Sequence, residues 1–241
     1  MRFRFSRIAS AVALMTGIFA GTAAQASDAF TDAMQEAYAP YRVALFRTNS
    51  NAQPESQQAI ALAQQSWARL TSQFAAKPPA PYDRDASFAR SLDEVAKVYA
   101  KADEQVGANQ LSAAHETLEA ARDIMAELRH RNQVIVYSDH MNAYHAEMEE
   151  VLINGPKLLA VPNGMLQMTA KVGALDYLAK KLSAEAPVNL AKDPEFDGLV
   201  KPVMKSVADL QAALWAQDAQ KVKEAIDKVK QPYSKFFLKF G

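Results

Sequence analysis

The 241-residue chain contains no cysteine and only 8 glycines and 11 prolines. Without cysteine it has no disulfides, iron–sulfur clusters, covalently attached haem, thiol nucleophile or blue-copper site. The scarcity of glycine and proline leaves few turn signals and disfavours an all-β fold. The G-x-S-x-G, H-E-x-x-H, P-loop and dinucleotide-binding glycine motifs are also absent. We therefore expect a helical protein that is not an enzyme.

An excess of charge of either sign is also lacking, since 27 basic residues balance 27 acidic ones. A nucleic-acid-binding protein usually carries a basic stripe, and none occurs here, so we expect no nucleic-acid partner. No helix shows the basic amphipathic face that is typical of lipid binding. With 49% hydrophobic and 22% charged residues, the composition is that of a folded globular chain rather than a disordered one.

The N-terminus has the features of a cleavable secretion signal. Three arginines lie within the first seven residues, and the apolar stretch 8–20 is too short to span a bilayer comfortably. Ala24-Gln25-Ala26 is an A-x-A cleavage pattern, which predicts Ser27 as the first mature residue. The sequence thus predicts a signal peptide over residues 1–26 and a soluble periplasmic protein.

Apolar residues recur with a helical period along almost the whole mature chain. This pattern predicts eight helices, at about residues 28–48, 54–74, 88–106, from 110 to a break at 134–136, 137–153, 163–182, 196–216 and 219–240. The break is predicted at Val134-Ile135-Val136, because β-branched residues crowd a helix. If the chain ran through this point as one helix, His115 and His145 would lie about 45 Å apart at about 1.5 Å per residue.

The apolar pattern also repeats within the chain at a shift of 107 to 108 residues. Residues 30–34 then align with 137–141, and Trp67, Leu70 and Phe74 align with Leu175, Leu178 and Leu182. Such a repeat predicts an internal duplication. The expected fold is all-α, with two tandem antiparallel four-helix bundles at 27–133 and 134–241.

An exported antiparallel bundle of about a hundred residues with an early methionine resembles the periplasmic four-helix-bundle cytochromes of the b-type and c-prime groups. The stretch from Leu214 to Ala225 is similar to the final hairpin of the b-type member. This resemblance implies haem b held between a methionine of the first helix and a histidine near the end of the fourth. No Cys-x-x-Cys-His motif is present, so the covalent attachment of the c-prime group is absent.

Only the first half matches the haem ligands that this resemblance implies. Met34 and Met141 stand at the methionine position, and His130 lies about one residue from the histidine position. In the second half Leu238 and Lys239 stand at the histidine position. The resemblance therefore implies a haem site made by Met34 and His130.

A second candidate site follows from the histidines, all four of which lie within residues 115–145. His145 and Glu149 are one helical turn apart and can reach one ion from the same face, with Met148 beside them. Imidazole with thioether suits copper, and imidazole with carboxylate suits iron. The full set of candidate metal ligands is His145, Met148, Glu149, Met141, Met165, Met168, His140 and His115.

Ordinary structural roles are open for the same residues. Methionines at core spacing commonly fill gaps in packing, and His140 beside Asp139 fits the polar start of a helix. His115 with Glu119 and Arg122 fits charge pairing along one helix, unless the chain folds back and brings His115 level with Glu149.

Three functions therefore stay open for this exported protein. The first is the binding of a transition metal, copper or iron, for metal handling through a His/Met/Glu site. The second is a haem-b-binding electron-transfer or carrier bundle, and the third is a cofactor-free interaction module. The expected partners are a metal ion or haem and a periplasmic or membrane protein, while the identity of the metal and the oligomeric state stay open.

Overall fold

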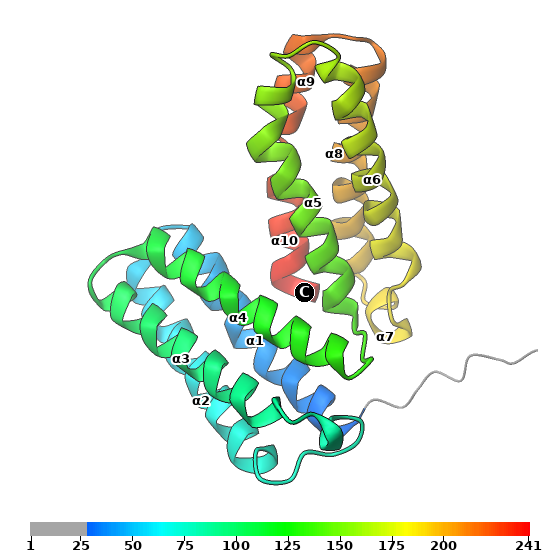
Figure 1. Cartoon of the computed structure of the whole chain (residues 1–241). Helices are drawn as coiled ribbons and strands as arrows, with labels where there is room; N and C mark the ends of the chain where they lie inside the picture. The colour runs from blue at the N-terminus through cyan, green and yellow to red at the C-terminus, as the bar shows by residue number, and fades with distance from the viewer. Residues whose placement is uncertain (1–27) are drawn as a thin grey trace, which may run out of the picture.

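A computed structural model describes residues 28–241, and the expected signal peptide and Ser27 lie outside them. No strand occurs in this range, so the all-α prediction is confirmed. Two groups of helices lie at an angle to each other (Figure 1). No helix within residues 28–241 is long and apolar enough to cross a bilayer.

The first group is built from four long helices, and each of them packs against two neighbours. These helices are α1 (Ala29–Asn49), α2 (Gln53–Phe74), α3 (Phe88–Gly107) and α4 (Leu111–Arg131), with the short 3₁₀ turn η1 (Tyr82–Arg84) before α3. α2 contacts α1 and α3, and α4 contacts α3 and α1, which closes a four-helix bundle. α1 begins at Asp28, whose carboxylate accepts hydrogen bonds from the backbone N–H groups of Phe30 and Thr31.

The second group repeats this order of neighbours. Its helices are α5 (Tyr137–Leu158), α6 (Gly164–Ala184), α7 (Val188–Ala191), α8 (Phe196–Trp215), α9 (Ala219–Ile226) and α10 (Lys230–Phe240). α6 contacts α5 and α8, while α9 and α10 each contact both α5 and α8. Together α9 and α10 thus take the place of a fourth helix. The same neighbour order in both groups is what the internal repeat predicts.

Two helix boundaries differ from the sequence prediction, both for reasons of packing or proline geometry. α5 continues past Asn154 to Leu158, and Gly155 within it serves close packing, since a Cβ on it would lie 2.7 Å from Met168 Cε. The helix expected at 219–240 is interrupted at 227–229. Pro232 has no N–H for the carbonyl of Lys228, so it is accommodated in the first turn of a new helix.

The predicted break between the fourth and fifth helices is confirmed. α4 ends at Arg131 and α5 begins at Tyr137, with Gln133 in the left-handed region at φ 59° between them. The two bundles meet where α1 packs against α10, with the rings of Tyr38 and Phe237 6.5 Å apart. Because the chain turns here, α4 and α5 bring residues far apart in sequence to one junction.

Candidate metal site at the junction of the two bundles

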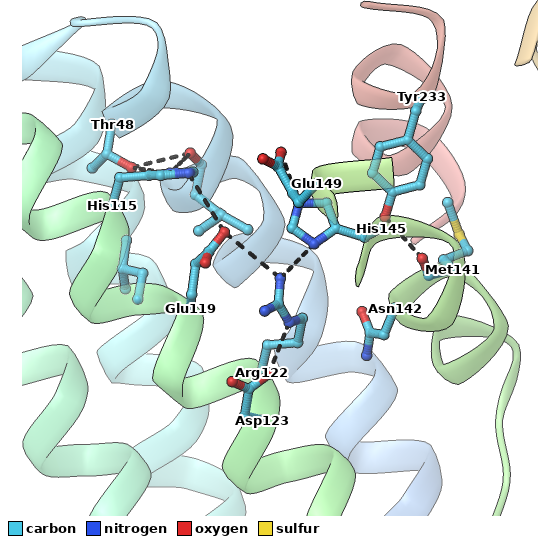
Figure 2. A network of polar contacts seen from close by, with 12 residues as sticks. Thr48, His115, Glu119, Arg122, Asp123, Met141, Asn142, His145, Glu149 and Tyr233 are labelled. Carbon is cyan, nitrogen blue, oxygen red and sulfur yellow. Dashed lines mark hydrogen bonds and ion pairs between the residues drawn. The ribbon is translucent and has the colours of Figure 1, made fainter. Parts of the chain in front are cut away.

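A small pocket lies at the junction, with walls from α1, α4, α5 and α10. Its volume is about 40 Å³, which is room for about three water molecules. The polar and sulfur-bearing side chains of its lining include His115, Glu119, Arg122, His145, Met148 and Lys230. We call this space the junction pocket. Its two histidines come from different bundles and share one cavity because the chain turns after α4 (Figure 2).

His115 is held with one ring nitrogen prepared to act as a ligand. Its Nδ1 lies 3.0 Å from the carbonyl oxygen of Leu45 and 3.4 Å from the hydroxyl of Thr48. A carbonyl oxygen can only accept, so we assign the hydrogen to Nδ1. In the neutral ring the lone pair is then on Nε2, which lies 3.7 Å from Glu119 Oε1. Metal-binding histidines commonly donate their other N–H to a backbone carbonyl in this way.

His145 has the opposite arrangement. Its Nδ1 accepts a hydrogen bond from Arg122 Nη1 at 3.0 Å, because a guanidinium can only donate. The hydrogen of the neutral ring is therefore on Nε2, which faces Glu149 Oε1 at 3.6 Å, and the ring stacks on Tyr233. A metal at His145 would have to displace the bond from Arg122.

Burial keeps His145 uncharged. Desolvation, helped by the charges of Arg122 and Lys230 and by the nearby His115, lowers the pKa of the imidazole to about 3. The ring is thus neutral throughout the physiological pH range and acts as a hydrogen-bond acceptor for Arg122.

The charges around the junction pocket nearly balance. Arg122 lies 3.7 Å from Glu119 and 3.1 Å from Asp123, and Lys230 lies 3.2 Å from Glu149. Figure 2 shows Arg122 between Glu119 and His145. Glu119 and the adjoining Glu149 therefore balance Arg122 and Lys230, while Asp123 is 71% exposed and does not line the pocket. In residues 28–241 no three histidine or acidic side chains converge on one point, so a metal here needs a further donor.

Only some of the predicted metal ligands lie together in the structure. Met148 is fully buried and lines the junction pocket with His115 and His145, while Glu149 adjoins them. Met168 packs against Gly155 towards the far end of the second bundle. The residues of the set that do not line the pocket are the adjoining Glu149 and, away from it, Met141, Met165, Met168 and His140. Of the four methionines in the predicted set, only Met148 therefore lines the junction pocket.

The expected haem ligands have other partners. Arg129, one residue before His130, is fully buried and donates from Nη1 to the sulfur of Met34 at 3.2 Å. Its other nitrogens pair with the carboxylate of Asp139, Nε at 3.2 Å and Nη2 more closely. His130 is half exposed and lies 3.9 Å from Asp139. An arginine thus stands against Met34 where the resemblance requires a histidine, and this donor set does not fit a haem iron.

Several residues of the junction were not found from the sequence. Arg122 pairs with Glu119 as expected, but its bond to His145 crosses from one bundle to the other. Lys230 and Tyr233 come from the last helix, 85 or more residues after His145. The one available signal was the repeat, which places the last helix of the second half beside its first.

Comparisons of the chain with protein-family models, curated proteins and solved structures find no match. The resemblance to bundle cytochromes therefore stays an interpretation of the sequence. Proposals about function rest on the geometry of the described residues.

Proposed function

We propose that this exported helical-bundle protein handles copper and binds one Cu(I) ion in the junction pocket. The observation that carries the proposal is the state of His115: its Nδ1 is tied to the carbonyl of Leu45, which leaves Nε2 free beside Glu119. This is the geometry of an imidazole oriented by its neighbours before the metal arrives.

The donor chemistry favours copper over hard cations. His115 supplies an imidazole and Met148 a thioether, and both suit Cu(I) but are poor ligands for Mg²⁺ or Ca²⁺. A divalent ion such as Zn²⁺ or Fe²⁺ would add more positive charge next to Arg122, and we expect it to bind less tightly.

A Cu(I) titration against a chromogenic chelator under anaerobic conditions tests the proposal. We expect one equivalent to bind to the full mature chain. His115→Ala and Met148→Leu should each weaken binding about tenfold or more, since each removes a donor. Met148→Leu nearly conserves side-chain volume, so the core should stay packed.

Matched variants separate the site from general effects. His130→Ala removes a half-exposed imidazole outside the pocket, and Met168→Leu removes a buried thioether outside it. His145→Gln keeps an acceptor for Arg122. These three should bind Cu(I) as the unchanged protein does. Loss of binding in His145→Gln with retention in His115→Ala would overturn the assignment of the ligand.

The same samples address the two other functions. A Soret band after addition of haem b would favour the haem-binding alternative. Failure to bind Cu(I), Zn²⁺, Fe²⁺ and haem would favour the cofactor-free module, which is supported by the engagement of Met34 with Arg129.

A further inference from the structure

The end of the second bundle that lies away from the junction carries exposed apolar side chains. They lie near the end of α5, in the connection from α5 to α6, in the first turn of α6 and at the end of α8, and these helix ends lie together at the top of Figure 1. Ile153, Val161, Leu166 and Trp215 are 59%, 47%, 72% and 71% exposed. We call these four residues the apolar tip. Exposed apolar side chains that gather at one end of a protein commonly mark a binding surface.

Charge is distributed unevenly on the α5–α6 side of this end, whereas the α8–α9 side carries Asp218, which pairs with Lys221 at 3.2 Å. The 25 residues from Val151 to Leu175 contain two lysines, Lys157 and Lys171, and no acidic residue, although the chain as a whole has 27 acids. Lys171 pairs with Glu150 at 3.5 Å. Lys157 is exposed and has no ion-pair partner among the residues that the structure describes. The segment therefore presents apolar groups and positive charge, a pattern that complements an anionic surface.

The shape of the end also limits what it can contact. The residues sit on helix ends and on the short connection 159–163, which form one end of the second bundle in Figure 1. Such an end suits a deformable lipid interface, in which tryptophan lies at the headgroup level and small apolar side chains reach below it.

We propose that the apolar tip docks the protein peripherally on anionic lipid membranes. Val161, Leu166 and Trp215 enter the interfacial region, and the Lys157 ammonium contacts lipid phosphate. Copper binding at the junction pocket plays no part in this contact.

Trp215 is a built-in reporter of docking, because the chain has two tryptophans and the other, Trp67, is buried. Vesicles of phosphatidylcholine with phosphatidylglycerol should shift the emission of the folded mature protein to shorter wavelength. Vesicles of phosphatidylcholine alone should give a much smaller shift, and salt should reverse the binding. An equal shift with both vesicles would overturn the charge part of the proposal, and no shift with either would overturn all of it.

Variants test whether the named residues make the contact. Leu166→Ser removes one leucine from the lipid phase and should lower the partition coefficient about tenfold. Lys157→Glu should lower it by a similar factor on anionic vesicles. Tyr177→Ser and Ile135→Ser, which change equally exposed apolar residues outside the tip, are the controls. If the controls weaken binding as much as Leu166→Ser does, or if Leu166→Ser has no effect, the tip is not the docking surface.

Discussion

Arg129→Ala is expected to lower the free energy of unfolding by about 3–5 kcal/mol, because it leaves the Asp139 carboxylate buried without its partner. Arg129 is fully buried and makes a two-nitrogen contact with Asp139. Asp139 also accepts from the backbone N–H of Val136 at 2.9 Å, so the pair stabilises the start of α5. The pair thus links the end of one bundle to the beginning of the next. Urea denaturation followed by circular dichroism measures the loss.

Two further variants distinguish an unpaired buried charge from a simple loss of packing. Arg129→Met combined with Asp139→Asn removes both charges, and we expect it to recover much of the stability. Arg90→Ala breaks the exposed pair with Glu94 and should cost less than about 1 kcal/mol. If the double variant is as unstable as Arg129→Ala, the buried charge is not the cause.

The second large effect is a loss of stability in acid that originates at His145. Burial lowers the pKa of this histidine to about 3, whereas in the unfolded chain it is near 6.5. Between these values the unfolded state binds a proton that the folded state does not. The contribution of neutral His145 to the free energy of unfolding is therefore fully present above about pH 6.5. Below that pH the free energy of unfolding falls by about 1.4 kcal/mol for each pH unit, until about pH 3.

The measurement is the free energy of unfolding of the metal-free protein between pH 7 and pH 4, compared with His145→Gln. The difference between the two slopes isolates His145 from the carboxylates that titrate in the same range. The groups that face the ring are Arg122 and His115 from α4, Glu149 from α5, and Lys230 and Tyr233 from α10. His130→Gln, which changes a half-exposed histidine, should retain the slope of the unchanged protein. Parallel slopes for the unchanged protein and His145→Gln would contradict the assignment.

Most of the fold could be predicted from the sequence because the apolar period is strong and turn residues are few. The break at 134–136 was predicted from β-branched residues, and it separates α4 from α5 as expected. The errors in helix boundaries arose at a glycine and a proline, residue types that fit more than one structural role. The fifth helix was predicted to end at residue 153, but it continues through Gly155, which permits the approach of Met168. Pro232 read as the interior of a helix, but it lies in the first turn of a new one.

The candidate site was predicted less well, since it depends on how two bundles cross. Helical spacing placed His145 and Glu149 on one face, and His145 Nε2 lies 3.6 Å from Glu149 Oε1. It could not show that Arg122 donates to His145 from the other bundle. Nor could it show that the carbonyl of Leu45 holds Nδ1 of His115, which leaves the lone pair on Nε2. The cytochrome resemblance shows a related limit, because an offset of one residue turns a helix face by about 100° and places Arg129 rather than His130 against Met34.

The central claim is that His115 binds Cu(I) through Nε2, and long-range ¹H–¹⁵N correlation spectra of the histidine rings test it most directly. Cu(I) is diamagnetic, so all four histidines can be followed in one sample. Without metal, we expect a proton on Nδ1 of His115 and on Nε2 of His145. One equivalent of Cu(I) should shift the Nε2 signal of His115 and leave the tautomer of His145 unchanged. Unchanged signals of His115 together with a shifted His145, or no change in any histidine, would contradict the account.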